Sequence, residues 1–280
     1  MKVPTPGLGT AHRCGSSARV LNQAQSPQPT EGQRVERFRY FDIGLKHHIL
    51  CNPTSIAKLD AMLALLAIPA NGRLLDIACG KAELLVRAVE RYGCSAVGVD
   101  LSPYALQEAR ALVAARVPDA NVELLEIDGA AYDGPYASFD AVCCLGASWI
   151  WQGHTGTLKA LARWARPGGY ILVGEPYWRK EPDPEYLAAD DLKADVFASH
   201  HGNVEAGVKL GLTPVYATTS NFDEWDHYET LQWYAVERWA REHPNDPDRA
   251  EILERAARYR ESYLRWGRDT LGWALYLFRK

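Results

Sequence analysis

The run LLDIACGKAELL, residues 74–85, places chemically useful residues at the junction of two elements. An apolar stretch carries an acid, Asp76, and a turn of small residues then leads into a pattern with helical spacing. Turns of this kind, between a buried strand and a helix, let backbone amides approach a nucleotide-like ligand. The residues that would form the contact surface are Asp76, Ala78, Cys79, Gly80 and Ala82.

The spacing of the small residues decides between classes of ligand. In a dinucleotide fingerprint, GxGxxG, the third position would be Glu83, where a small residue is needed beside a pyrophosphate. Glu83 is large and negative, so this register fails. In a GxGxG register the three positions are Ala78, Gly80 and Ala82, which are all small. The sequence contains no GxxxxGK[ST] phosphate loop. The turn therefore favours an amino-acid or nucleoside group over a diphosphate.

Periodicity predicts strands that alternate with amphipathic helices around this turn. Such alternation is typical of a parallel sheet with helices on both faces. We predict an α/β fold, a Rossmann-like doubly wound sheet of seven mostly parallel strands, with a helical insertion between the last two. The predicted strands are 73–78, 95–100, 122–127, 139–145, 170–175, 213–220 and 272–278, and the predicted helices are 56–67, 81–92, 103–117, 155–165 and 204–210.

Three segments stand apart from this alternation. Residues 1–34 are rich in Pro, Gly, Ser, Gln and Thr without periodicity, which predicts a disordered leader before one domain at 35–280. Residues 225–267 form a helical block rich in Trp and Tyr. That block is either a lid over a substrate pocket or a packing and dimerisation element, since a long helix needs an apolar face merely to fold. Residues 39–52 could form a second lid.

The cofactor turn begins a series of motifs that resembles class I S-adenosylmethionine-dependent methyltransferases. The resemblance covers roughly residues 54–220 and the final strand. Each motif is weak alone, but five in the right order at suitable spacings are a strong signal. The motifs are Asp76–Ala82, Gly98–Ser102, Ile127–Gly129, Phe139–Val142 and Arg166–Gly169. The stretches 144–150, 174–178 and 225–228 further resemble a little-characterised bacterial branch of small-molecule methyltransferases, from which no substrate carries over.

The resemblance implies S-adenosyl-L-methionine as cofactor and assigns residues to its parts. The loop from Ala78 to Ala82 would hold the methionine part, and Asp100 would accept hydrogen bonds from both ribose hydroxyls. Asp100 could instead merely cap the following helix, and Asp128 could be a plain turn residue. The further residues implied in cofactor binding are Leu101 and Ser102 beside the base, Asp128, Gly129 and Ala130 at the adenine edge, and Leu145 and Gly146 near the sulfonium.

Candidate acceptor contacts follow the fourth and fifth predicted strands and open the helical block. Glu175 could act as a general base or bind a substrate amine, or it could be a structural carboxylate. His154 could donate or accept a proton near pH 7 and is a second catalytic candidate, although a lone histidine is more often a loop residue. Aromatic rings could exclude water or stack on the acceptor, with core packing as the alternative. They are Trp149, Trp151, Tyr177, Trp178, Trp225 and Tyr228.

Composition limits the class of partner. The net charge of −4 gives no global footprint for nucleic acid, and no apolar run approaches a membrane span. Six cysteines without CxxC spacing predict no metal and a reduced, cytoplasmic protein. The fourth strand lacks the [DNS]-P-P-[YF] signature of base amine methylation. We expect a small-molecule methyl acceptor, no nucleic acid, no membrane and a possible homodimer. The rivals are an RNA or protein methyltransferase, a non-catalytic S-adenosylmethionine-binding protein and, more distantly, a dehydrogenase.

Overall fold

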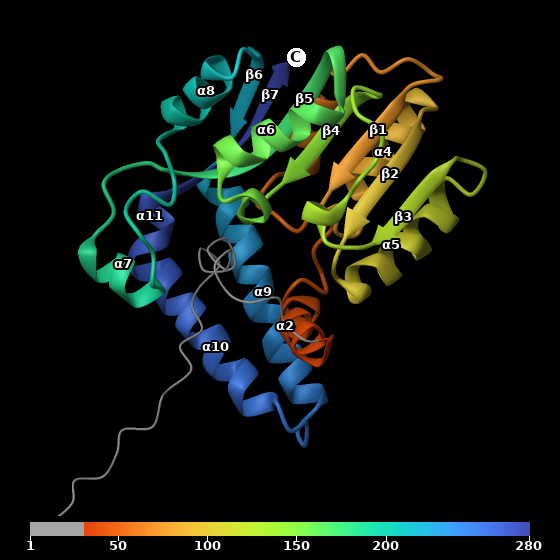
Figure 1. Ribbon diagram of the computed structural model, residues 1–280. Coiled ribbons are helices and arrows are strands. Elements are labelled where there is room, and N and C mark those ends of the chain that lie inside the picture. Colours follow the sequence, from red (N-terminus) through yellow and green to blue (C-terminus); the bar gives the residue numbers. More distant parts are fainter. Residues whose placement is uncertain (1–30) are drawn as a thin grey trace, which may run out of the picture.

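The computed structural model describes the backbone of residues 31–280 and the side chains from Phe38 onward. In this part of the chain seven strands form one sheet, ordered β3-β2-β1-β4-β5-β7-β6 (Figure 1). The strand β7 is antiparallel to β5 and β6, and the other pairings are parallel. This confirms the predicted Rossmann-like sheet. The strands are β1 (Arg73–Ile77), β2 (Ser95–Asp100), β3 (Val122–Glu126), β4 (Phe139–Leu145), β5 (Ala165–Trp178), β6 (Thr213–Thr219) and β7 (Leu271–Arg279).

Helices cover both faces of the sheet, and its central strands are therefore buried on both sides. One core holds the apolar side chains of α3, α4 and α5, and the other holds those of α6 together with α8. Consecutive residues of β1 alternate between the two cores, with Leu74 in the first and Leu75 in the second. The helices are α3 (Ile56–Leu63), α4 (Glu83–Tyr92), α5 (Pro103–Arg116), α6 (His154–Trp164) and α8 (His200–Lys209).

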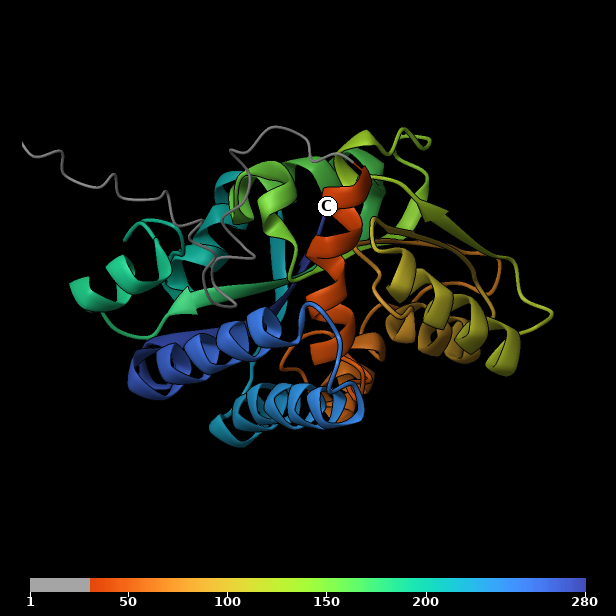
Figure 2. The same ribbon diagram turned by 90° about the horizontal axis from the view of Figure 1, so that it is seen from below.

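A third layer of helices lies across the carboxyl ends of the parallel strands (Figure 1). It consists of α2 (Glu31–Gly44), α9 (Phe222–Glu242) and α10 (Arg249–Ser262), and Figure 2 shows α9 and α10 side by side with α2 across the sheet edge. A small core joins the three, with Tyr40, Val236 and Tyr259 among its members. Because α9 and α10 fall between β6 and β7, the predicted helical insertion is confirmed.

The layer also contains short elements, and those that lie outside the predicted helical block at 225–267 were not predicted. The segment after α10 continues as η3 (Tyr263–Gly267) and α11 (Arg268–Thr270) before β7 begins. Between β5 and β6 the chain forms α7 (Pro184–Asp190), which is capped by the Asp183 side chain. These helices are too short for a hydrophobic period to identify them.

The strand β5 is longer than predicted at both ends. It begins at Ala165, because Ala165 already pairs with Phe139 across an irregularity in the β4–β5 register. It continues to Trp178, because β7 pairs with it from Tyr170 to Trp178. The Pro-Gly-Gly sequence at 167–169 is accommodated near the exposed start of the strand.

Most of the leader predicted over 1–34 lies outside the described residues, and within them the backbone is helical from Glu31. Across residues 31–280 no helix combines the length and the apolar character that crossing a bilayer requires.

Glu83, which argued against a dinucleotide, instead joins two helices of the fold. Its side chain is only 6% exposed, and its carboxylate accepts hydrogen bonds from Arg87 Nε at 2.6 Å and Arg116 Nη1 at 2.9 and 3.0 Å. Arg87 lies one turn along α4, whereas Arg116 ends α5. The negative charge of Glu83, at the first residue of α4, also interacts favourably with the helix dipole.

We predict that Glu83→Gln lowers the free energy of unfolding by about 2 kcal/mol, since it leaves two arginines facing a neutral amide in a largely buried place. Urea denaturation measures the loss. The matched control is Glu90→Gln, which breaks an exposed ion pair with the same Arg116 and should cost below about 1 kcal/mol. Equal losses in the two variants would contradict the structural role given to Glu83.

Candidate cofactor and acceptor site

The turn after β1 is built from residues in the left-handed region. The backbone φ angles are +60° at Ala78, +54° at Gly80 and +64° at Ala82. An alanine in this conformation costs roughly 1–2 kcal/mol. The turn is held by Cys79 N–H, which donates to Val99 O at 3.0 Å, and by Ala82 N–H, which donates to the Cys79 carbonyl at 2.9 Å. Because Ala82 is left-handed, α4 begins at Glu83 and not at the predicted Lys81.

Asp100 connects this turn to the next one. Its carboxylate accepts from Gly80 N–H at 2.8 Å and from Ser102 N–H at 2.8 Å, one oxygen to each amide. Burial raises the pKa of Asp100, and these backbone hydrogen bonds oppose the rise. Ser102 separately caps α5 by accepting from Ala105 N–H, so Asp100 is not the cap of that helix. A carboxylate has lone pairs beyond two amides and can accept from a diol as well.

Asp76 is the most deeply buried acid of the turn, with 3% of its surface exposed. Its Oδ1 has no hydrogen-bond partner among the described residues. Burial, with a smaller contribution from the charge of Asp100, raises the pKa of Asp76 to about 8. A cation or a hydrogen-bond donor placed beside such a buried carboxyl would stabilise its ionised form. The methionine ammonium group of S-adenosylmethionine is such a partner, so the acid fits the implied cofactor.

The third turn, after β3, carries Asp128 at the start of a short 3-10 helix, η1 (Gly129–Ala131). Asp128 Oδ1 accepts from Ala130 N–H at 2.9 Å. Gly129 packs closely under η2 (Ser148–Trp151), since a Cβ there would lie 2.6 Å from Ile77 Cγ2 and 3.1 Å from Ile150 Cδ1. The adenine contact of Asp128, Gly129, Ala130 and Leu101 stays a prediction, because the turn geometry suits a cap equally well.

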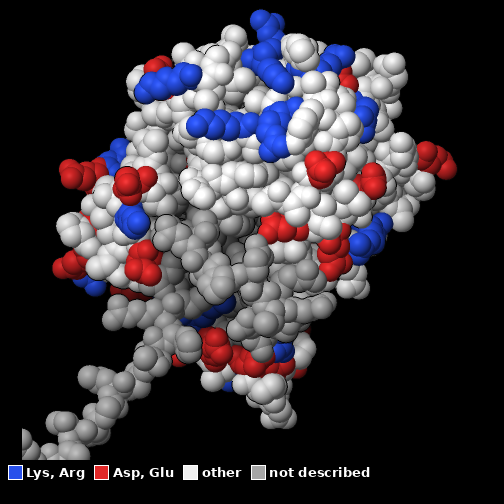
Figure 3. Space-filling view, viewed as in Figure 1, with Lys and Arg blue, Asp and Glu red and all other residues white. Residues whose placement is uncertain are grey.

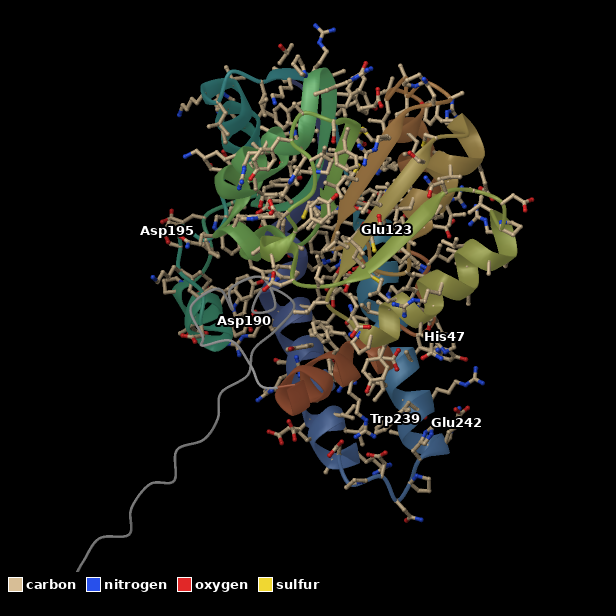
Figure 4. All side chains as sticks on the ribbon, turned by 45° about the vertical axis from the view of Figure 1, so that its right-hand side comes forward. His47, Glu123, Asp190, Asp195, Trp239 and Glu242 are labelled. Atoms are coloured by element: carbon tan, nitrogen blue, oxygen red, sulfur yellow. The ribbon has the colours of Figure 1, made fainter. Side chains whose placement is uncertain are left out.

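A segment between α2 and α3 lies over the cofactor turn. We call residues 45–52 the strap. Lys81 Nζ donates to the carbonyls of Leu45 at 2.8 Å, Lys46 at 3.4 Å and His48 at 3.1 Å, and it pairs with Glu108 at 2.8 Å. Figure 4 shows His47, within the strap, below α5 and beside α9.

The far end of the strap reaches the glycine of the turn. A Cβ on Gly80 would lie 3.5 Å from Cys51 Sγ, within ordinary van der Waals contact, so the strap lies directly over the turn. Sequence analysis missed Lys81 and Cys51. The signal for Lys81 was a lysine between the small residues Gly80 and Ala82, which the prediction explained only as the first residue of a helix.

The acceptor end of the site is formed where β4 and β5 end. Gly146, with a φ of +88°, donates its N–H to Gly174 O at 2.9 Å. The ring of Trp273 from β7 lies against both glycines: a Cβ would come within 2.9 Å of it at Gly146 and 2.6 Å at Gly174. Trp273 Nε1 donates to Thr54 Oγ1 at 2.9 Å. Sequence analysis missed Trp273, because in a buried final strand an aromatic residue looks like core.

Glu175 is 2% exposed and lies one residue beyond this contact. Its Oε1 accepts from Ser148 Oγ at 2.9 Å, while Oε2 has no partner within the described part of the chain. Burial raises the pKa of Glu175 to about 8, and the Ser148 hydrogen bond opposes the rise. One carboxyl oxygen is therefore held by Ser148, and the other is buried without a partner in the described part of the chain, just beyond the point where β4 ends beside Gly174.

His154 is engaged elsewhere. Its Nε2 donates to the Asn203 carbonyl at 3.0 Å, and its ring packs edge-on against Tyr276 at 5.4 Å. Burial lowers the pKa of His154 to about 4, so the ring is neutral. These contacts tie α6 to α8 and β7, and no hydrogen bond joins His154 to Glu175. Its catalytic role stays a prediction, but the geometry favours a packing role.

The six aromatic candidates fall into two groups. Trp151 packs on Trp164 at 6.1 Å, Tyr177 lies 5.2 Å from His200, and Trp149 joins the core beneath α6. Trp178 donates from Nε1 to Ala194 O at 2.8 Å and packs on Phe197.

Two of the six, Trp225 and Tyr228, lie on α9 at the strap. Tyr228 OH donates to Cys51 O at 3.4 Å, and His48 Nε2 donates to Tyr228 O at 2.8 Å. Of the six, Tyr228 is brought towards the cofactor turn by contacts with the strap. Trp225 lies three residues earlier on α9 and belongs to the core that also holds Trp273. Within residues 31–280, no group of three or more His, Cys, Asp or Glu residues could hold a metal ion.

Comparisons with known proteins agree on the chemistry of this site. A family model described as a methyltransferase domain matches residues 74–169, from β1 to the start of β5. The crystal structure of a SAM-dependent methyltransferase from Thiobacillus denitrificans, in complex with S-adenosyl-L-homocysteine, is similar at a TM-score of 0.79 and 31% identity. That match covers 86% of this chain and 97% of the other.

Two curated relatives extend the comparison. The uncharacterized protein YjhP of Escherichia coli K12 is 28% identical over 240 residues, which is 85% of this chain and 96% of YjhP. The 27-O-demethylrifamycin SV methyltransferase of Amycolatopsis mediterranei is 28% identical over 131 residues, 47% of each chain. The likeness to YjhP agrees with the predicted little-characterised bacterial branch.

We predict that Asp100→Ala weakens binding of S-adenosylhomocysteine by about 1.5–3 kcal/mol, the range for hydrogen bonds to a charged group. The variant loses the implied hydrogen-bond acceptor for the ribose and also the two hydrogen bonds that join the turns at Gly80 and Ser102. Isothermal titration calorimetry measures the change. Glu123→Ala removes an exposed acid from the neighbouring strand β3 (Figure 4) and should leave the affinity unaltered. An unchanged affinity in Asp100→Ala would remove Asp100 from the site.

We predict that Lys81→Met frees the strap, because three carbonyls lose their common donor. Amide hydrogen exchange of peptides covering 45–52 should quicken, and affinity for S-adenosylhomocysteine should fall about fivefold, equivalent to roughly one hydrogen bond. Lys46→Met is the control, since the Lys46 side chain pairs with the same Glu108 but holds no strap carbonyl. The same exchange rate in both variants would mean that Lys81 does not secure the strap.

Proposed function

The chain belongs to the S-adenosylmethionine-dependent methyltransferases, and we propose that it methylates a small organic molecule held between the carboxyl edge of the sheet and the helical layer. The observation that carries this proposal is the strap. It runs over the cofactor turn, is secured by Lys81, and contacts α9 through Tyr228. A segment that covers the cofactor turn in this way supports a reaction site shielded from water and an acceptor small enough to be enclosed. The similarity to a methyltransferase that acts on a rifamycin supports an organic acceptor.

When bound, S-adenosylmethionine supplies an electrophilic methyl group on a sulfonium. The residues of the chain would hold and orient it: Asp76 faces the amino-acid end with a buried carboxyl, and Asp100 offers a carboxylate to the ribose. Because Gly146 and Gly174 have no side chains, the ring of Trp273 packs directly against them and would form one wall of the acceptor site. Methyl transfer needs alignment and exclusion of water more than covalent help from the protein.

Glu175 would remove a proton from the acceptor. Ser148 fixes one carboxyl oxygen, so the free Oε2 keeps a defined direction. With a pKa of about 8 the group is a poor acid and a competent base near physiological pH. The proton that Oε2 accepts is the one the acceptor oxygen or nitrogen loses as its bond to the methyl group forms.

The distribution of charge supports a small acceptor over nucleic acid. On the face seen in Figure 3, the Lys and Arg side chains gather over α6 and the upper edge of the sheet, where the parallel strands begin. Exposed Lys159 and Arg163 of α6 and Arg166 at the start of β5 belong to this region. An RNA-binding surface would be expected at the opposite edge, beside the cofactor turn, because the reaction occurs there.

The proposal is tested by incubating the protein with methyl-labelled S-adenosylmethionine and a bacterial extract divided into small molecules, RNA and protein. Label should enter the small-molecule portion. Label in RNA or protein would overturn the proposed acceptor class. Cofactor binding without label transfer to any of the three portions would indicate a non-catalytic binding protein.

We predict that wild-type turnover rises as pH increases through about 8, because the fraction of ionised Glu175 rises through its pKa. Glu175→Gln should lower turnover about 100-fold, flatten this pH dependence and leave affinity for S-adenosylhomocysteine unchanged. Ser148→Ala removes a hydrogen bond that favours the ionised form, so its midpoint should move to higher pH. Wild-type turnover in Glu175→Gln would leave Glu175 a structural carboxylate.

A further inference from the structure

The inner face of α9 carries polar groups as well as rings. Its buried stripe follows helical spacing, at Trp225, Glu229, Gln232 and Val236, with Tyr228 and Trp233 beside them. Trp225 and Gln232 are each 6% exposed. The stripe faces the strap and α2: Tyr228 contacts Cys51, and a Cβ on Gly44 would lie 3.8 Å from Gln232 Oε1. The stripe therefore lies against the strap, which in turn covers Gly80.

Three hydrogen-bond donors of this stripe have no acceptor. Trp225 Nε1, Gln232 Nε2 and Trp233 Nε1 are all buried, and none finds a partner in the described part of the chain. Leaving such a donor unsatisfied costs about 1–3 kcal/mol, and most buried polar groups in proteins are paired. Three unsatisfied donors within nine residues of one helix face mark a place where a ligand completes the hydrogen bonding.

The chemistry of these groups restricts that ligand. An indole nitrogen can only donate, so Trp225 and Trp233 each require an acceptor atom. His48, 7% exposed on the strap, adds the opposite function. Its Nε2 donates to the Tyr228 carbonyl, so the neutral ring presents Nδ1 as an acceptor, and Nδ1 is buried without a partner among the described residues. A hydroxyl group could satisfy His48 and an indole together, because it both donates and accepts.

We infer that the methyl acceptor is an oxygen-rich molecule, bearing hydroxyl or carbonyl groups, whose oxygens accept hydrogen bonds from Trp225 Nε1, Gln232 Nε2 and Trp233 Nε1. The inference rests on the proposed function and names the substrate class of the same site. Trp225 belongs to the same buried core as Trp273, whose ring packs against Gly146 and Gly174. We therefore place the donor stripe between the point of methyl transfer and the strap. The acceptor lies along α9, with its reacting oxygen at the β4 and β5 ends.

The test uses methyl-labelled S-adenosylmethionine with the small-molecule portion of a bacterial extract. Labelled products are passed over a cation exchanger at neutral pH. Products of an oxygen-rich acceptor without an amine should appear in the flow-through. Labelled products retained as amines would overturn the inference while leaving the proposed function intact. Absence of label from all small molecules would overturn the proposed function, and the inference with it.

Variants that delete one N–H and keep an aromatic ring identify the contacts. Trp225→Phe and Trp233→Phe should each raise the amount of extract needed for half-maximal turnover about tenfold. Trp239→Phe is the matched control, since Trp239 lies on the same helix but stacks on His243 near its exposed end (Figure 4). If the first two variants behave like Trp239→Phe, the indoles do not bind the acceptor.

A direct readout separates binding from loss of folding. In protein labelled with nitrogen-15 at tryptophan, the Nε1–H resonances of Trp225 and Trp233 should move when the active flow-through fraction is added, and that of Trp239 should not. Chemical shifts at Trp225 and Trp233 that stay fixed in the presence of a turned-over acceptor would contradict the inference.

Discussion

The site depends on one carboxylate that joins two turns. Asp100 ends β2, yet its oxygens are divided between Gly80 N–H of the first turn and Ser102 N–H of the second. Both turns must come to the same edge of the sheet for these bonds to form, and adjacent parallel strands guarantee that they do. The rest of the site is arranged around this point: the strap lies over Gly80, and Asp76 is buried beneath it. The Asp100 carboxylate therefore holds the two turns together whether or not a cofactor is bound.

Much of this arrangement could be predicted, because its causes are local. Hydrophobic runs gave the strands of the sheet, and the spacing of Ala78, Gly80 and Ala82 gave the turn and the class of ligand. The pattern could not predict the strained backbone of the turn. Two of these three residues are alanines held at positive φ, which nothing in the sequence distinguishes from helical alanines. For the same reason the start of α4 was predicted two residues too early.

The acceptor side was less predictable, because its contacts join segments far apart in the chain. Trp273 reads as a core residue of a final strand, and only the sheet order brings its ring to Gly146 and Gly174. His154 shows the reverse. The sequence offered it as a catalytic candidate or a loop residue, but its side chain is buried and bound to Asn203 of α8. The direction of a side chain within such a fold depends on which helix packs over it, and periodicity does not contain that information.

The three carbonyls bound by Lys81 also imply an order of assembly. Residues 45–48 can be secured only after Lys81 has been placed by the strained turn and by α4, and the contacts of Tyr228 with the strap join residues 177 and 180 positions apart. Contacts of such long range form late, since chain closure must be completed first. The helical layer should thus dock on a sheet already formed. During synthesis, the site would remain open until the last strand, β7, had joined β5 and fixed α9 in place.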